Sequence, residues 1–446
     1  MRRLRTPRPR VHDHEAAPPK RDLRHFLKIF GPGIITGAAD DDPSGIATYA
    51  QTGAQFGFGQ LWTALYQIPL LLAVQEACAR IGAVTGKGLA GVIKQRYSRA
   101  ALMIVVLLVV VANTINIGAD IAAVGEATNL VIPIPRPVLV VLTTAIVLGL
   151  EIFISYESYA KFLKWLALAL LAYPATTLIV KQPWAQILYA TFVPHIELTA
   201  SFLFIITGVF GTSISPYMFF WQASEEVEEE RMLGLKHKRN GDPRLPRSFL
   251  SDMRLDTAAG MIAAEAAQWF IIITTATVLF RHGVTNIGTA ADAAKALEPL
   301  VQSFPHAGAL ARTIFAVGIV GLGLLGIPVL AGAAAYALSE AFGWKEGLSR
   351  KWNEAPGFYG VITVATLVGL SVNFAGINPM KALVFSAVFN GIAAVPLLFV
   401  IARINASGSI LGSNRGGKLS QFMVWLTFGV MALSGAALVY TTVSGR

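Results

Sequence analysis

The sequence predicts an all-α integral membrane protein with about eleven transmembrane helices, on three observations. Of the 446 residues 54% are hydrophobic, and the mean hydropathy is +0.58. Only 14% are charged, against about 25% in soluble domains. Apolar segments long enough to cross a bilayer recur along the whole chain. We place the spans at 28–54, 61–80, 101–126, 137–155, 159–180, 199–224, 255–280, 308–342, 357–374, 381–402 and 419–442.

The positive charge of the chain follows this topology. The formal net charge is +10, and 29 of the 36 Lys and Arg residues fall on one side of the membrane when the spans are counted alternately. Loops rich in Lys and Arg stay in the cytoplasm. We therefore expect a multi-pass protein of the plasma (inner) membrane, with its N-terminus in the cytoplasm and its C-terminus outside. Its partner is the lipid bilayer and not nucleic acid, and its oligomeric state is left open.

Two polar segments lie outside the apolar spans. Residues 1–27 are rich in Arg and Pro, and we expect a disordered basic tail near anionic lipid. The run Ser224–Glu230 after the sixth span contains five glutamates. We interpret this run as the solvated end of a helix, with a metal-sensing or regulatory acidic patch as the alternative.

The first span is interrupted by three consecutive acids, Asp40, Asp41 and Asp42, followed by Pro43 and a Ser-Gly step. An Asp at the centre of a membrane helix costs about 2.5–3.5 kcal/mol, so acids at this depth are usually functional. Proline donates no backbone hydrogen bond, and glycine favours leaving the helix. A helix broken beside acids exposes carbonyl and carboxylate oxygens, which suit a hard cation.

The sixth span repeats this pattern. Ile34-Ile35-Thr36-Gly37 recurs as Ile205-Ile206-Thr207-Gly208, and each copy precedes a proline in a polar break. Paired interrupted spans are typical of transporters built from inverted repeats, with the binding site between the breaks. The prediction is therefore a 5+5 inverted repeat with broken helices 1 and 6. The first repeat is 28–180 (spans 1–5), the second is 199–402 (spans 6–10), and span 11 at 419–442 is appended.

Two motifs resemble a known family. The segment Gly31-Pro32-Gly33, followed by Asp42-Pro43-Ser44-Gly45-Ile46-Ala47-Thr48, is similar to the first-helix signature of the Nramp (natural resistance-associated macrophage protein) divalent-metal transporters. The segment Gln75-Glu76-Ala77-Cys78-Ala79-Arg80-Ile81-Gly82 is similar to the end of their second helix. The resemblance spans about Phe30 to Arg403. It implies the fold of amino-acid/sodium symporters and inward metal transport by alternating access.

The resemblance also implies a metal site, from which this chain departs. The family signature reads DPGN in helix 1 and A-x-x-M-P-H in helix 6. Asp42 is kept, but Gly45 stands at the Asn position, Thr212 at the Ala position, Ser215 at the Met position and Tyr217 at the His position. The candidate metal ligands are Asp42, Gly45, Thr212, Ser215, Asp41 and Asp40. Carboxylate, hydroxyl and carbonyl ligands without a thioether suit Mg²⁺ or Mn²⁺, with Fe²⁺ a further option.

The proton pathway implied by the family is altered as well. Of the acidic pair in the family's third helix, the resemblance assigns Asp120 to the later position, and Glu126 follows one to two turns beyond. The arginines at the start of helix 9 are replaced by the segment 358–362. Asp120, Glu126 and Tyr217 are candidate gating or proton-pathway residues, and facilitated uptake without proton coupling is a plausible outcome.

Other polar residues in the spans have commoner uses. Glu265 in span 7 is an intramembrane acid near the cytoplasmic half, with extension of its side chain toward the interface as the alternative. Asn113, Asn116 and Asn390 are interpreted as hydrogen-bonding residues between helices. Two other functions stay open: an organic-solute (amino-acid-like) carrier of the same fold, which the aspartates disfavour, and a non-transporting metal sensor. No nucleophile–base pair or phosphate loop suggests an enzyme, and the metal is expected as substrate and not as cofactor.

Overall fold

The computed structural model describes residues 32–154, 167–232 and 247–444. Among these residues, nine helices are long and apolar enough to cross a membrane. The two other expected spans are 28–54, which is divided into two shorter helices, and 159–180, of which 159–166 lies outside the described residues. The predicted basic tail at 1–27 also lies outside them. The fold is that of a multi-pass helical membrane protein.

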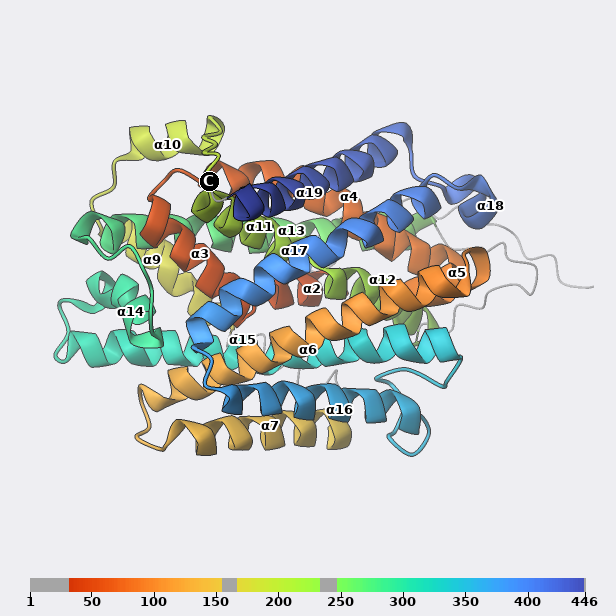
Figure 1. The fold of residues 1–446 in the computed structure, drawn as a ribbon, viewed down its shortest axis with the longest axis horizontal. Helices are drawn as coiled ribbons and strands as arrows, with labels where there is room; N and C mark the ends of the chain where they lie inside the picture. Colours follow the sequence, from red (N-terminus) through yellow and green to blue (C-terminus); the bar gives the residue numbers. More distant parts are fainter. Residues whose placement is uncertain (1–31, 155–166, 233–246, 445–446) are drawn as a thin grey trace, which may run out of the picture.

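The long helices lie side by side along the longest axis of the molecule (Figure 1). They are α4 (Trp62–Thr85), α6 (Arg99–Asn129), α7 (Arg136–Phe153), α13 (Arg247–Val278), α15 (Ala307–Phe342), α16 (Pro356–Val372), α17 (Pro379–Asn405) and α19 (Lys418–Ser444). The short helices are α5 (Leu89–Arg96), η1 (Ala167–Leu171), α9 (Ala172–Ile179), α10 (Trp184–Phe192), η2 (Phe280–His282), α14 (Ala290–Ala294), η3 (Lys295–Val301), η4 (Asn373–Ala375), α18 (Gly408–Leu411) and η5 (Gly412–Asn414). Helices α5 and α18 lie at one end of the bundle, and α10, α14 and the C-terminus lie at the other.

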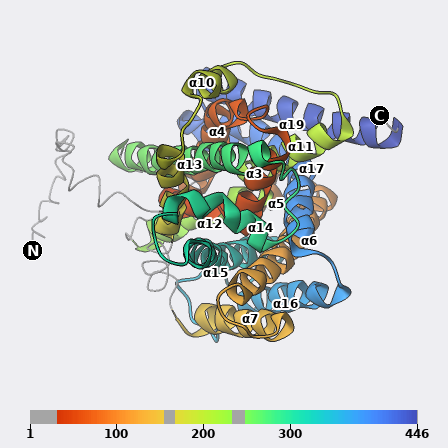
Figure 2. The ribbon, with the colours of Figure 1, turned by 90° about the vertical axis from the view of Figure 1, so that its left-hand side faces the viewer.

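Both predicted helix breaks are present. Span 1 consists of α2 (Pro32–Asp40) and α3 (Pro43–Phe56), and span 6 consists of α11 (Ala200–Ser213) and α12 (Pro216–Met232). The second half of span 1, α3, packs against the first half of span 6, α11, while α2 packs against α12. The two broken spans therefore run antiparallel through the centre of the molecule (Figures 1 and 2). This is the relation that inverted repeats require.

Helix α13 runs parallel to span 1 at backbone contact. A Cβ atom added to Gly37 would meet the backbone of Gly260, and one added to Gly33 would meet the backbone of Thr257. Small residues allow this approach between membrane helices. The carboxylate of Asp256 caps the start of α2, because Oδ2 accepts a hydrogen bond from the amide of Gly33 at 2.6 Å. These contacts hold α2 and α13 in one register.

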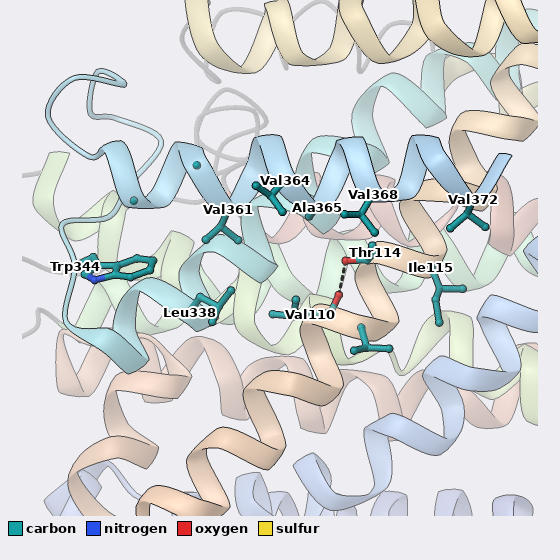
Figure 3. Close-up of a pocket in the computed structure, with 13 residues that line it drawn as sticks. Val110, Thr114, Ile115, Leu338, Trp344, Val361, Val364, Ala365, Val368 and Val372 are labelled. Carbon is teal, nitrogen blue, oxygen red and sulfur yellow. Dashed lines mark hydrogen bonds between the residues drawn. The ribbon is translucent and has the colours of Figure 1, made fainter. Parts of the chain in front are cut away.

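A large apolar hollow lies away from the two breaks. Its volume is about 740 Å³, and it lies between α6 and α16 with Trp344 at one end (Figure 3). Valines dominate its lining, and the hydroxyl of Thr114 donates to the carbonyl of Val110 at 2.7 Å, within α6. Such a surface suits hydrocarbon and not a cation. The acidic helix breaks in spans 1 and 6 are therefore the better candidate for a cation site.

The acidic run after span 6 differs from its interpretation as a solvated helix end. Glu226, Glu228 and Glu230 are 1%, 4% and 1% exposed, because the end of α12 packs against α4, α15 and α2. Glu228 accepts hydrogen bonds from the hydroxyl of Tyr336 at 2.9 Å and from the amide of Ser349 at 3.2 Å. That interpretation is wrong: hydropathy marks the run as polar but does not show which helices cover it.

Candidate cation site

Asp42 occupies the break in span 1 as the N-cap of α3. Its Oδ1 accepts hydrogen bonds from the amide of Gly45 at 2.8 Å and from the hydroxyl of Ser44 at 2.6 Å. Asp is a preferred N-cap because its carboxylate satisfies the free amides of the first turn, and Pro43 is favourable at the first helical position. The side chain is 1% exposed. The capping geometry therefore fixes a buried carboxylate at the helix break.

The second carboxylate oxygen of Asp42 is held by α6. Asn116 donates to Oδ2 at 2.9 Å, and the hydroxyl of Ser386 on α17 donates to the side-chain oxygen of Asn116 at 2.6 Å. Asp120, one turn further along α6, is fully buried and lies within electrostatic range of Asp42. It faces the amide of Ser44 without a well-formed hydrogen bond. The structure thus brings Asp42 and Asp120 together.

Asp40 and Asp41 are also buried, at 1% and 3% exposure. Both oxygens of Asp40 and Oδ1 of Asp41 have no hydrogen-bond partner. Glu265 on α13 lies within electrostatic range of both. Glu265 is itself 1% exposed, which excludes the alternative that its side chain extends toward the interface. Five carboxyl groups, those of Asp40, Asp41, Asp42, Asp120 and Glu265, lie around one helix break, and within the described residues none of them is paired with Lys, Arg or His.

The break in span 6 lies directly beside the first. The position of a Cβ on Gly45 would be 2.9 Å from the carbonyl oxygen of Asp40 and 3.2 Å from the hydroxyl of Thr212. That hydroxyl is buried and has no hydrogen-bond partner. Ser215 donates to the carbonyls of Thr212 and Gly211 at 2.5 and 2.6 Å. Ser215 therefore satisfies carbonyls freed at the break, which leaves its oxygen as an acceptor only.

Tyr217 connects the two broken helices. It is 1% exposed, and its hydroxyl donates to the carbonyl of Ala39 at the end of α2, at 3.0 Å. Glu126 is not part of this cluster. It is half-buried further along α6, where it accepts a hydrogen bond from the amide of Ala290 in α14 at 2.8 Å. Of the three candidate gating or proton-pathway residues, Asp120 and Tyr217 thus lie at the breaks, and Glu126 lies under the loop that contains α14.

The acids at the breaks do not form a closed metal cage. Over residues 32–154, 167–232 and 247–444, no three His, Cys, Asp or Glu side chains converge as metal ligands do. A cation between the breaks would be bound by a few carboxylate oxygens, carbonyl and hydroxyl oxygens, and water. This donor set is hard and incompletely closed, which suits a divalent ion that keeps part of its hydration shell.

Three polar residues of the site were not identified as such from the sequence. Asn116 was expected to bond between helices, which is confirmed, but its acceptor is the central aspartate. Tyr49 and Ser213 pair at 3.0 Å beside Glu265, and no spacing pattern indicated them. Asn390, also expected to bond between helices, has no hydrogen-bond partner, so that expectation is wrong.

The relatives of this chain include proteins named as divalent metal cation transporters. The chain is 24% identical over 442 residues to the "Divalent metal cation transporter MntH" of Ralstonia nicotianae, covering 96% of this chain and 95% of that protein. It is 23% identical to the protein of the same name from Agrobacterium fabrum, covering 94% and 88%.

The fold resembles those of solved transporters. The Eremococcus coleocola manganese transporter aligns with a TM-score of 0.74 at 18% identity, over 93% of this chain and 86% of that one. MhsT, solved in complex with L-phenylalanine, aligns with a TM-score of 0.58 at 14% identity, over 93% and 98%. These likenesses show an all-helical, inverted-repeat membrane fold.

The sequence pattern of one family covers nearly the whole chain. The natural resistance-associated macrophage protein-like pattern matches residues 33–441, which includes both helix breaks and all the helices that contribute to the site. Because the match extends well beyond half of the chain, this protein belongs to the Nramp family of membrane transporters and is not an enzyme.

Proposed function

We propose that this protein transports divalent metal cations into the cell across the cytoplasmic membrane by alternating access, with Mg²⁺ or Mn²⁺ as cargo. One observation carries the proposal: a buried, capped carboxylate, Asp42, stands between two adjacent helix breaks with further acids around it. The relatives named as divalent metal cation transporters support it. The metal is the transported substrate and not a cofactor.

The hardness of the donor set supports the choice of ions. Candidate ligands are the carboxylates of Asp40, Asp41 and Asp42, the hydroxyl or carbonyl of Thr212 and the oxygen of Ser215. Gly45 supplies no side-chain ligand, and a Cβ atom added to it would lie close to the carbonyl of Asp40 and the hydroxyl of Thr212. Mg²⁺ favours oxygen ligands and retains part of its water shell. An organic anion is disfavoured, because uncompensated carboxylates would repel it.

The membrane potential alone can drive this uptake. At 100 mV, negative inside, two charges moving inward gain about 4.6 kcal/mol, from about 2.3 kcal/mol per charge. Asp120 lies near Asp42, but the segment 358–362 at the start of α16 contains none of the arginines that the family has there. We therefore assign uncoupled, potential-driven transport to this chain.

The proposed alternating-access unit consists of two inverted repeats, 28–180 and 199–402, with span 11 at 419–442 appended.

Ion uptake into proteoliposomes tests the function. With a fixed inside-negative potential, wild-type protein is expected to take up Mg²⁺ or Mn²⁺ without internal acidification. Asp42→Asn keeps the shape of the side chain but removes its charge, and we expect uptake to fall at least tenfold. Asp292→Asn is the control, since Asp292 lies in the short helix α14, away from the breaks, and pairs with Lys295 at 2.9 Å. Equal uptake by wild type and Asp42→Asn would refute the proposal.

A further inference from the structure

We infer that Glu265 of α13 is a cargo-binding, specificity-determining residue, which together with Asp40 and Asp41 forms a second acidic wall of the cation site, beside Asp42. The inference rests on the proposed function. It adds a residue from span 7 to a site that the sequence motifs confine to spans 1 and 6. It also explains why three consecutive aspartates occur where the family signature has one.

The packing of α13 against α2 places Glu265 at the break. Asp256 caps Gly33, 223 residues earlier in the chain, and Gly260 lies against Gly37 at the same offset. One further turn along both parallel helices brings Asp41 level with residues 264–265. The same register continues beyond the break, where a Cβ on Gly53 would meet the backbone nitrogen of Ala276, again 223 residues on, at 3.0 Å. Glu265 is thus positioned by backbone contacts on both sides of the break and not by a flexible loop.

The carboxyl groups on this wall have no cationic partner among the described residues, and most of their oxygens accept no hydrogen bond. Oε1 of Glu265, both oxygens of Asp40 and Oδ1 of Asp41 are buried without a hydrogen bond. Glu265 lies against the hydroxyl of Ser213. The amide of Gln268, in the orientation that suits its neighbours, donates to Oε2 at 3.3 Å. Buried charges are normally paired or bind metal ions. Free oxygens from two helices, with no cationic side chain of the described residues among them, point to a cation as the missing partner.

The two acidic walls differ in how their carboxylate oxygens are hydrogen-bonded. The Asp42 wall is fully organised, because Asn116, Ser44 and the amide of Gly45 hold its oxygens. The wall formed by Asp40, Asp41 and Glu265 has unpaired oxygens but no tight convergence. Such a wall attracts a divalent ion through its charge and accepts its water ligands. It favours two charges over one, since the Coulomb attraction scales with the charge of the ion.

The test measures concentration-dependent uptake of Mg²⁺ and of Mn²⁺ in proteoliposomes. Glu265→Gln is expected to raise the half-saturating concentration at least tenfold, with a smaller effect on the maximal rate. Glu265→Asp keeps the charge on a shorter side chain and is expected to recover most of the affinity. Glu151→Gln is the matched control, because Glu151 is also buried at 3% exposure with both oxygens unpaired, but lies in α7.

A melting experiment in detergent adds a readout that does not require transport. A neutral amide is easier to bury than an uncompensated carboxylate, so Glu265→Gln is expected to melt at least as high as wild type without metal. Its stabilisation by added Mn²⁺ should be smaller than that of wild type. Wild-type half-saturation and a wild-type Mn²⁺ shift in Glu265→Gln would overturn this inference alone. If the wild-type protein takes up no divalent ion, both the proposed function and this inference fail.

Discussion

At the residue scale, the central feature is that Asp42 is oriented by other side chains before any ion arrives. Its two oxygens accept from three groups, and Asn116 is itself held by Ser386. A buried carboxylate with a chain of satisfied donors behind it is more rigid than one held by the backbone alone. This preorganisation is what a transport site requires, since the ion then displaces little structure on binding.

Removing Asn116 should weaken cation binding. In Asn116→Ala, Oδ2 of Asp42 and the hydroxyl of Ser386 lose their partner, and an unsatisfied buried group costs about 1–3 kcal/mol. We expect the half-saturating concentration of Mn²⁺ uptake to rise about tenfold, which corresponds to about 1.4 kcal/mol.

The companion variant Ser386→Ala should have a smaller effect, because Ser386 touches Asp42 only through Asn116 and also donates to the carbonyl of Leu383. Uptake kinetics of the two variants, measured side by side, show which half-saturating concentration rises more. A larger rise in Ser386→Ala than in Asn116→Ala would contradict the view that Ser386 acts on Asp42 through Asn116.

At the element scale, the site depends on the close packing of α13 against span 1. Glycines 33, 37 and 260 bring two backbones together, and the cap from Asp256 fixes their register. Helix association in membranes relies on such packing, because lipid tails are as apolar as leucine. The position of Glu265 beside Asp41 is therefore a property of the helix pair and not of either helix alone.

Filling this contact should destabilise the protein. In Gly37→Ala the new methyl group meets the backbone of Gly260, which cannot move aside as a side chain would. We expect a loss of about 1–3 kcal/mol, as for overpacked cores, and a lower melting temperature in detergent. Gly429→Ala in α19 is the matched control: its methyl group meets nothing within 4 Å, so the melting temperature should stay or rise.

At the scale of the whole molecule, charge distribution sets the orientation in the membrane. The end of the bundle with α5 and α18 holds the loops that are rich in Lys and Arg, and the opposite end carries α10, α14 and the C-terminus (Figure 1). We propose that the first end faces the cytoplasm. Inward transport of cations then follows the membrane potential.

Cysteine labelling can check this orientation. The native Cys78 is fully buried and provides a silent background. We expect Ser303→Cys, exposed in the loop before α15, to react with a membrane-impermeant thiol reagent in intact cells. Ser409→Cys, exposed in α18 at the opposite end, should react only after permeabilisation. Labelling of Ser409→Cys alone in intact cells would reverse the assignment.

The sequence by itself determined the membrane class, the two helix breaks and the place of Asp42 in the first of them. These features depend on hydropathy, proline and capping, which act over a few neighbouring residues. Only the tertiary structure decided that Glu265 lies beside Asp41, that Asn116 holds Asp42 and that the glutamates after span 6 are buried. These pairings depend on the register between helices far apart in the chain. That register is set by backbone contact between small residues, and no local pattern in the sequence specifies which helix a given face will meet.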